Sequence, residues 1–448
     1  MKIIKEHKGN MGTVYLISIN KEIIKEVNLQ LITKKRNSND YFLMLNSIGE
    51  INQTVFYFIN YVCKYDTSNS KVQSLQALKL LYSFSEIIYK DISLFTNKDF
   101  NDFSRFVLGQ SITGTQEEWH FRTPRSINTH NVYMATIRKY FRHLNIENIS
   151  IFDSLVVDIS KSAYGKLAHT KNRTEIKYQS NLTKKKNNKV PKFISVEEFK
   201  KIKVELINND KLLSIRNEVI IDLMYLKGLR LGEVLGLTLE DIKNHPDNEN
   251  AGILTIRNRI SDKSYQCAKN SIHPKSKNDY STTIYKDHGV DQITLPEGLK
   301  KMIYEYIDRS RDLSTISNRI ISNMLEKSHA DSIDSNENNY YLFLSRNGTP
   351  LTSSGWNYVL RKLFNKLSIH TDKTTRTTNL SHRFRHGYAM YLINELNLSL
   401  EEVSRYMRHR SVTSTYIYYN PTEQEIVEST IVLEKQIEQK LFEGECMY

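Results

Sequence analysis

The sequence predicts a mainly α-helical protein with a small antiparallel sheet, in which a helical domain is joined to an α+β domain. Two stretches between residues 50 and 150 carry apolar residues at intervals of three and four, which matches one face of a helix. After residue 195, helical stretches alternate with short apolar runs that are typical of strands. Hydrophobic residues make up 39% of the 448 residues and charged residues 25%, which indicates a globular protein. At roughly 100–200 residues per domain, two or three domains are expected.

Residues 1–49 alternate apolar and polar residues over short stretches, as in Thr13–Ile19, and we predict an N-terminal appendage that contains strands. Residues 50–160 follow as a helical domain. Its helices are marked by Leu75, Leu78, Leu81 and Tyr82, and by Met134, Ile137, Phe141 and Leu144. The second helix also carries Arg138, Lys139, Arg142 and His143. Such a basic face is expected either of a helix that contacts DNA or of an ordinary solvent-exposed face.

Residues 161–192 carry ten Lys and Arg residues against a single acidic residue, Glu175. Because like charges repel one another and resist packing, we predict an extended basic linker here. Ser195 and Glu198 then form an S-x-x-E capping box, which is typical of the first turn of a helix. The next domain is therefore expected to span residues 193–421.

The first half of this domain is predicted to contain a long helix and three strands. The helix runs through residues 219–226 and ends at Gly228, where a glycine is the usual terminating residue. The expected strands are residues 253–256, 292–295 and 341–344.

Further along, the dipeptide Asn347-Gly348 predicts a tight turn after the last strand. Ser353 or Ser354 is expected to cap the helix that follows. Residues 305–340 have the composition of a polar insertion. After Pro421, residues 422–448 are predicted to form a tail helix whose apolar positions are Ile426, Leu433, Ile437 and Leu441.

The charge balance favours a polyanionic partner, because 63 Lys and Arg face 50 Asp and Glu, a formal net charge of +13. No stretch approaches the ~18 consecutive apolar residues of a membrane-spanning helix, so no membrane partner is expected. The N-terminal segment has charges where a signal peptide needs an apolar core. The three cysteines, Cys63, Cys267 and Cys446, have neither disulfide-framework nor zinc spacing, which predicts a protein of the reducing cytoplasm.

Three C-terminal segments carry the residues of greatest chemical interest. In GLRLGEVLGL, residues 228–237, Arg230 stands at the junction of two helices, where a guanidinium can grip a phosphate or a carboxylate. In SHRFRHGYA, residues 381–389, His382 and Arg385 are three apart and share one helix face. Each of these segments alone is also compatible with ordinary surface residues.

The third segment is YMRHRSVTSTYIYYNP, residues 406–421, in which His409 precedes Tyr418 by nine residues. The chain has 27 tyrosines, so a given tyrosine is more often a packing residue than a nucleophile. A phenol with a pKa near ~10 attacks at neutral pH only if neighbouring groups stabilise the phenolate and the transition state.

The order of these groups, an arginine, then H-x-x-R-H, then a histidine nine residues before a tyrosine, resembles the tyrosine recombinases, the phage-integrase-type site-specific recombinases of integrases and transposons. The resemblance is strong over residues 219–242 and 376–420 and weaker over 52–145. It implies a helical core-binding domain and a catalytic domain. It also implies cleavage and rejoining of DNA through a 3′-phosphotyrosyl intermediate, with no metal, cofactor or ATP.

The resemblance also implies a role for each matching residue. Arg230 and Arg385 correspond to the two catalytic arginines of the family, and His382 opens its H-x-x-R motif. His409 corresponds to the later histidine or tryptophan position. Tyr418 corresponds to the nucleophile. A neutral His382 could accept the tyrosine proton or hold the phosphate.

The family further uses a lysine on a β-hairpin between the two arginine motifs. Here Lys275, within HPKSKND, is the first choice for this general acid, and Lys277 and Lys269 are its rivals, because the segment 258–291 is longer than the usual hairpin. Arg408 is a departure, since the family commonly has glycine before the histidine that matches His409.

By the same resemblance, the partner is double-stranded DNA and the working assembly is a homotetramer on two DNA sites, in DNA integration or recombination of a mobile element. Three alternatives stay open from the residues. They are a type IB-like topoisomerase, a catalytically inactive DNA-binding protein of the same fold, and a metal-dependent transposase, although no triad of acidic residues is evident for the last.

Overall fold

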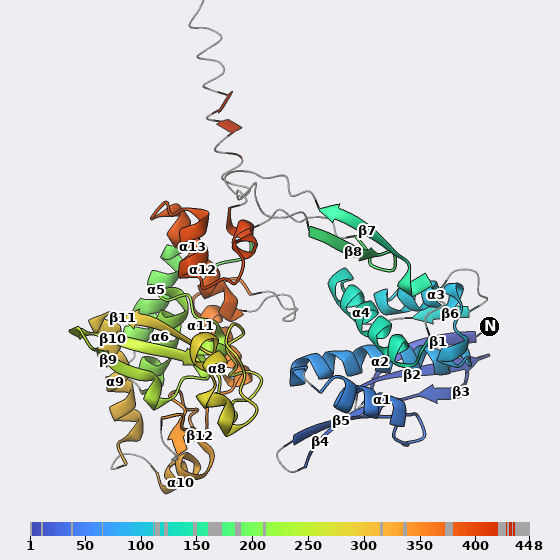
Figure 1. The fold of residues 1–448 in the computed structure, drawn as a ribbon, viewed down its shortest axis with the longest axis horizontal. Helices are drawn as coiled ribbons and strands as arrows, with labels where there is room; N and C mark the ends of the chain where they lie inside the picture. The colour runs from blue at the N-terminus through green and yellow to red at the C-terminus, as the bar shows by residue number, and fades with distance from the viewer. Residues whose placement is uncertain are drawn as a thin grey trace, which may run out of the picture. The chain divides into compact units, whose positions relative to one another are not determined.

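The computed structural model divides the chain into two compact units, Met1–Lys186 and Asn187–Tyr448. It describes residues 2–9, 12–36, 39–64, 66–110, 112, 117–120, 124–146, 150–159, 173–183, 190–208, 212–313, 317–334, 338–371, 380–419, 427, 430, 431, 433 and 434. The fold class is confirmed, because helices predominate and the sheets are small and mainly antiparallel (Figure 1). None of the helices in these ranges is long and apolar enough to cross a membrane.

The first unit begins with strands. They are β1 (Lys2–Gly9), β2 (Gly12–Ile19), β3 (Glu22–Val27), β4 (Gln30–Arg36) and β5 (Asn39–Leu45). A four-stranded sheet has the order β3-β2-β1-β6, where β6 (Glu117–His120) joins β1 in parallel, and β4 pairs with β5 as a separate antiparallel hairpin. Residues 13–19, predicted as strand, fall in β2, in which Val14, Tyr15 and Ile17 are buried.

The helices of this unit are α1 (Gln53–Tyr57), α2 (Ser68–Ile88), α3 (Asn97–Leu108) and α4 (Ile127–His143). The helical spacing in the sequence marks α2 and α4, which agree with the prediction. The strands of residues 1–49 and these helices share one hydrophobic core. For example, the ring of Tyr15 in β2 lies 5.2 Å from the ring of Phe106 in α3. Residues 1–49 therefore pack as part of the first unit.

The basic face expected on α4 is largely occupied by internal contacts. Arg138 is buried, and its guanidinium donates to the Ser180 hydroxyl at 2.6 Å and to the Asn181 side chain at 3.1 Å. Lys139 forms an ion pair with Asp66 at 3.1 Å. Arg138 is thus a structural residue that holds the chain just after β8 (Arg173–Tyr178).

The basic run of residues 161–192 is described only in part. Strand β8 pairs antiparallel with β7 (Ser154–Ile159), so this part of the run is extended but belongs to a hairpin. Residues 160–172 and 184–189, which include Lys184, Lys185 and Lys186, lie outside the described residues. The linker role of this segment stays a prediction.

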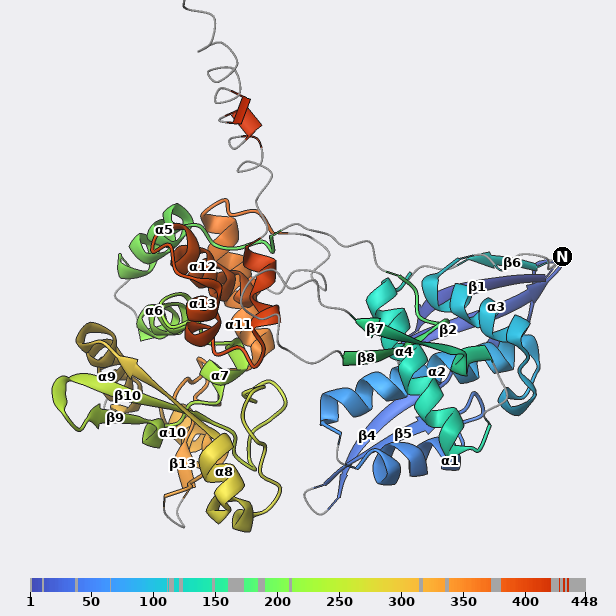
Figure 2. The same ribbon diagram turned by 45° about the horizontal axis from the view of Figure 1, so that its top comes forward.

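The second unit contains a helical group and a sheet. Its helices are α5 (Val196–Ile207), α6 (Leu212–Tyr225), α7 (Leu231–Leu235), α8 (Thr283–His288), α9 (Glu297–Arg311), α10 (Asn318–Lys327), α11 (Ser353–Lys366), α12 (Leu380–Asn394) and α13 (Leu400–Tyr406). Its strands are β9 (Ile242–His245), β10 (Asn248–Arg257), β11 (Val290–Leu295), β12 (His329–Asp331) and β13 (Asn338–Tyr340). Figure 2 shows α12 and α13 at one end of this unit and the sheet β11-β10-β9 with α9 and α10 at the other.

Two predicted starting points of helices can be checked at the side-chain level. The capping box of Ser195 and Glu198 is present at the start of α5. Helix α11 is capped by Thr352, whose hydroxyl accepts from the backbone N–H of Gly355, so the prediction of Ser353 or Ser354 is wrong by one residue. The physical reason is that the cap must precede the first helical residue and face the third one.

Two further predictions in this unit are corrected. Residues 341–344 are buried but form only isolated bridges, because the N–H of Leu342 bonds to Leu237 and that of Leu344 bonds to the hydroxyl of Tyr306. Residues 305–340 are not a polar insertion throughout. They contain the second half of α9 and all of α10, whose polar faces hid their helical period.

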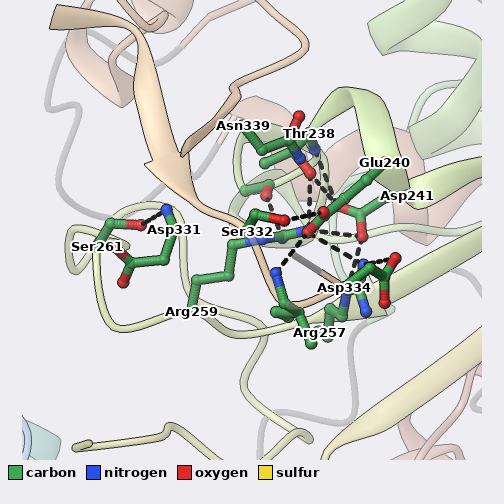
Figure 3. Close-up of polar contacts among 12 residues, drawn as sticks. Thr238, Glu240, Asp241, Arg257, Arg259, Ser261, Asp331, Ser332, Asp334 and Asn339 are labelled. Carbon is green, nitrogen blue, oxygen red and sulfur yellow. Dashed lines mark hydrogen bonds and ion pairs between the residues drawn. The ribbon is translucent and has the colours of Figure 1, made fainter. Parts of the chain in front are cut away.

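A buried ion network fixes the segment that leaves β10 (Figure 3). Arg259 is fully buried, and its Nη2 donates to Thr238 at 2.7 Å, to Asp241 at 2.8 Å and to Glu240 at 3.0 Å. Arg257 reaches the same Asp241 carboxylate at 2.8 Å. Because these acids stand in the turn shortly after α7, the network ties the segment 258–289 to the helix that follows Arg230.

Candidate active site

Arg230 stands at the N-cap of the short helix α7, and the preceding turn explains its placement. Gly228 has φ +61°, and a Cβ on it would lie 2.4 Å from the ring of Tyr388, so this position requires glycine twice over. The carboxylate of Glu233 accepts from the backbone N–H of Arg230 at 2.9 Å and from its Nη1 at 2.8 Å. These contacts fix the orientation of the Arg230 side chain. Glu233 bonds only Nη1 of the guanidinium, which leaves its other N–H donors to face a ligand.

Arg385 joins two loops of the site from the middle of α12. It is 3% exposed, and its guanidinium donates to the carbonyl oxygens of Gly228 and Met407. These contacts connect the turn before α7 with the end of α13. Burial, with a further contribution from Arg230, lowers the pKa of Arg385 to about 9. Arg230 and Arg385 are thus close enough to repel each other, which favours an anion between them.

Tyr418 is held inside the site. It is 5% exposed and belongs to the 3₁₀-helical turn Tyr416–Tyr418. Its hydroxyl oxygen lies 2.7 Å from Nδ1 of His386 on α12. Tyr416 and Tyr419 are 46% and 37% exposed, so burial and contact distinguish Tyr418 from its neighbours.

Burial raises the pKa of the Tyr418 phenol, while the charges of Arg385 and Arg230 oppose that rise. The phenol is therefore protonated in the free protein, and the two arginines supply the field that would favour a phenolate. A bound anion and a proton acceptor would be needed before the oxygen could attack.

His386 and His409 lie beside the phenol, His382 stacks on His386, and all three histidines are neutral at neutral pH. Burial is the main cause in each case. It lowers the pKa of His382 to about 4, that of His386 to about 3 and that of His409 to about 4, with the site's arginines among the further contributions. The rings of His386 and His409 lie 5.5 Å and 6.4 Å from the ring of Tyr418. Nδ1 of His409 lies 2.9 Å from the hydroxyl of Thr415.

The geometry bears on which histidine is placed to receive the tyrosine proton. The sequence leaves two roles open for His382, to accept the tyrosine proton or to hold the phosphate, and the described contact of the Tyr418 hydroxyl is with His386. His382 stacks on His386 with ring centroids 5.7 Å apart. Residues 382 and 386 are one turn apart on the same face of α12, so the sequence spacing alone does not show which of the two histidines contacts Tyr418.

The three candidate lysines fall in different surroundings. The charge of Lys269 lowers the pKa of His382, so Lys269 lies near the site. The charge of Lys275 acts on His273 instead, and its backbone N–H bonds to Asp279. Lys277 lines a separate hollow with Arg257. Which of these lysines acts as a general acid stays a prediction.

The segment that carries Lys269 packs directly on the helix of Arg230. A Cβ at Gly232 would lie 2.5 Å from the carbonyl oxygen of Cys267, and one at Gly236 would lie 2.3 Å from that of Gln266. Only glycine allows so close an approach of two backbones. The Lys269 segment is therefore pressed against α7.

Two residues of the site had no assigned role in the sequence prediction. Glu233 is 4% exposed and bonds Arg230. In the sequence, its only mark is that it stands three residues after Arg230, a spacing at which two side chains of a helix can meet. His386 was visible in H-x-x-R-H, but nothing in the spacing indicates which histidine faces Tyr418. Among the described residues, no group of three or more His, Cys, Asp and Glu could hold a metal ion.

Comparisons with known proteins give consistent matches. Residues 290–425 match the model of the phage integrase family. Transposase A from transposon Tn554 of Staphylococcus aureus is 29% identical over 222 residues, which cover 48% of this chain and 58% of that protein. The tyrosine recombinase XerC of Listeria monocytogenes serotype 4b is 22% identical over 371 residues, 79% of this chain and 96% of that one.

Among solved structures, the transposon Tn1549 integrase in complex with transposon right end DNA has 16% sequence identity and a TM-score of 0.47, covering 85% of this chain and 99% of that one. The XerH site-specific recombinase bound to its difH substrate has 15% identity and a TM-score of 0.46, covering 80% and 78%. The aligned part of this chain spans little more than half the length of the Tn554 transposases, at 58%.

Proposed function

Because this chain carries a phage integrase family domain at residues 290–425, we propose that it is a site-specific DNA recombinase that cleaves and rejoins double-stranded DNA through a 3′-phosphotyrosyl intermediate. One observation carries the proposal. The buried Tyr418 hydroxyl lies 2.7 Å from a neutral histidine, within the field of the buried Arg385 and of Arg230. A phenol in such surroundings is suited to attack a phosphodiester.

The attack forms a bond between the Tyr418 oxygen and phosphorus, and the bond from phosphorus to the 5′ oxygen breaks. Negative charge grows on the two nonbridging oxygens, and the guanidiniums of Arg230 and Arg385 are the donors for them. Each preorganised donor of this kind typically contributes about 10²–10³ in rate. The new phosphotyrosyl bond has an energy similar to that of the broken bond, so rejoining needs no ATP.

The proton of the Tyr418 hydroxyl needs an acceptor, and His386 is the group in contact. Because the pKa of His386 is lowered to about 3 by burial, its ring is neutral and has one nitrogen free to accept. The negative phosphate of bound DNA raises the pKa of a nearby histidine, which favours this transfer once DNA is present. His382 and His409 then serve as partners of the phosphate.

The departing 5′ oxygen needs a proton, and we assign its delivery to Lys269. The charge of Lys269 acts on His382, the charge of Lys275 acts on His273, and Lys277 lines a separate hollow. The close packing of residues 266 and 267 against α7 supports a defined position for this lysine. The assignment replaces Lys275 as the first choice.

Exchange of strands requires two duplexes, and a homotetramer on two DNA sites is the assembly that supplies four nucleophiles. The net charge of +13 suits a DNA partner. The similar proteins carry the names transposase and tyrosine recombinase, which agrees with a role in mobile-element recombination.

The test is incubation of the purified protein with a duplex that bears its recombination site and a nick close to the cleavage position. The short strand released by cleavage then diffuses away, so rejoining is prevented and the covalent intermediate is trapped. A covalent protein–DNA adduct on Tyr418 is the expected product. Joining of strands between two labelled duplexes distinguishes recombination from relaxation by a topoisomerase. DNA binding with no adduct under any condition would contradict the proposal and favour a regulator of the same fold.

A further inference from the structure

Arg408 lies against the site in an unusual backbone conformation. It follows Met407, the C-cap residue of α13, and has φ +49°, the left-handed region that residues other than glycine rarely adopt. Its side chain is 12% exposed. Backbone hydrogen bonds from the N–H of Arg408 to Arg405 and from the N–H of His409 to Ser404 close the end of α13 around this left-handed residue.

The main contact of Arg408 is the carboxylate that already holds Arg230. Nη2 of Arg408 lies 2.6 Å from Oε2 of Glu233, the same oxygen that accepts from the backbone N–H of Arg230. The other oxygen, Oε1, accepts from Nη1 of Arg230 at 2.8 Å. One buried carboxylate is therefore shared by two arginines.

The charge balance of this trio explains why sharing matters. Burial opposes ionisation of Glu233, yet Arg408, Arg385 and Arg230 together keep its pKa below the usual range. Arg230 and Arg408 hold the Glu233 carboxylate from two sides, and Arg385 contributes a third positive charge, so the arginines outweigh this one buried carboxylate. Nε of Arg408 also lies 3.7 Å from the carboxylate of Asp291.

Arg408 is also connected to the segment that carries Lys269. Its carbonyl oxygen accepts from Nδ2 of Asn270 at 2.5 Å, and Arg410 donates to the carbonyl oxygen of Asn270 at 3.0 Å. The left-handed turn directs this carbonyl toward the segment while the side chain reaches Glu233. Arg408 therefore connects the turn that contains His409 with helix α7, through Glu233, and with the segment that carries Lys269, through Asn270.

We infer that Arg408 is a positioning residue for DNA cleavage, which acts through the shared Glu233 carboxylate to fix the orientation of Arg230. This inference rests on the proposed function. It gives a physical role to an arginine at a position where the resembling recombinases commonly have glycine.

The test measures the single-turnover cleavage rate on nicked DNA at saturating protein, together with DNA affinity and thermal unfolding. Arg408→Ala is expected to lower the cleavage rate by about 10- to 100-fold, the range of a misplaced catalytic group, with DNA affinity nearly unchanged. Arg408→Lys keeps the charge and is expected to recover part of the rate. Arg405→Ala, which removes an exposed arginine three residues earlier, is the matched control and should cleave at the wild-type rate.

Arg408→Gly separates positioning from folding. Glycine accepts the left-handed backbone without strain, so this variant is expected to unfold at a temperature no lower than that of Arg408→Ala, yet to cleave as slowly. In a double-mutant cycle, Glu233→Gln should lower cleavage, and adding Arg408→Ala should lower it little further.

Wild-type cleavage by Arg408→Gly would overturn the inference. So would a loss that disappears when the protein concentration is raised further, because that would make Arg408 a DNA-binding contact. Additive losses in the double-mutant cycle would show that Arg408 does not act through Glu233. Absence of an adduct with the wild-type protein would instead refute the proposed function itself.

Discussion

Nδ1 of His386 lies 2.7 Å from the hydroxyl oxygen of Tyr418, and the two residues are brought together from α12 and from the turn after α13. Both side chains are largely removed from water, and the histidine is neutral. A neutral imidazole in contact with a protonated phenol can accept the phenol proton. Under the proposed function, this transfer takes place once the DNA phosphate is bound. Burial and this contact distinguish Tyr418 from Tyr416 and Tyr419.

For His386, the nitrogen in contact with the phenol is expected to be the functional atom. His386→Leu removes it and should lower the rate of adduct formation by about 10²-fold or more, the usual contribution of general acid–base catalysis. His386→Asn places a polar atom close to the Nδ1 position and should keep more of the rate than His386→Gln, which reaches toward Nε2. Equal rates for Leu and Asn would show that the contact is only a packing contact.

For the nucleophile, Tyr418→Phe is expected to bind DNA normally and to form no covalent adduct. The controls are Tyr416→Phe and Tyr419→Phe, which alter more exposed rings and should still form it. Mapping of the DNA-linked peptide by mass spectrometry checks the assignment directly. An adduct on either neighbour would mean that the turn Tyr416–Tyr418 rearranges on DNA.

For the general acid, Lys269→Ala is expected to slow cleavage by about 10²–10⁴-fold on normal DNA. A 5′-thio leaving group needs no proton, so cleavage of such a substrate should be nearly restored. Lys275→Ala and Lys277→Ala should each change the cleavage rates of normal and 5′-thio DNA by the same factor. Thio-rescue of Lys275→Ala instead would return the role to the residue first chosen from the sequence.

The sequence predicted the parts of the fold that depend on short-range patterns. The helical periods identify α2 and α4, the capping box identifies the start of α5, and two strand predictions fall within β10 and β11. The resemblance to tyrosine recombinases is confirmed by the family match over residues 290–425. These features are local in sequence or fixed in order along the chain.

The remaining features depend on contacts between distant segments. Residues 341–344 have the composition of a strand, but their partners are a loop and a tyrosine hydroxyl. Arg138 has the appearance of a surface residue until Ser180 and Asn181 cover it. His382 and His386 share one face of α12, so the choice between them depends on where Tyr418 lies along the helix axis, which spacing does not encode. The predicted tail helix, residues 422–448, lies almost wholly outside the described residues.

The buried histidines predict a pH dependence of stability. The pKa of His386 is lowered to about 3 in the folded protein, against ~6.5 unfolded, so below pH 6.5 the unfolded state binds a proton that the folded state does not. The free energy of unfolding therefore falls as pH falls from 6.5 toward 3. At pH 5 the contribution of His386 is about 2 kcal/mol.

Asp222 and Asp262 act in the opposite direction, because burial raises their pKa values to about 6 and about 7. The measurement is therefore a comparison of urea unfolding at pH 7 and pH 5 for the wild-type protein and His386→Asn. The variant should lose less stability between the two pH values. Identical losses would show that His386 gains its proton as readily in the folded protein as in the unfolded one.

The last prediction concerns Arg259, whose fully buried guanidinium bonds Thr238, Glu240 and Asp241. Removing one partner of a buried ion network leaves charge that is poorly compensated, so Arg259→Ala is expected to lower the free energy of unfolding by about 3–5 kcal/mol. Lys301→Ala breaks an exposed pair with Glu297 and should change it by less than about 1 kcal/mol. Chemical denaturation of the two variants measures both values.

Because the network anchors the segment that leads to Lys269, the folded fraction of Arg259→Ala should also cleave normal DNA more slowly and recover on the 5′-thio substrate. A stable variant with wild-type cleavage would show that the packing of residues 266 and 267 on α7 is sufficient to hold that segment.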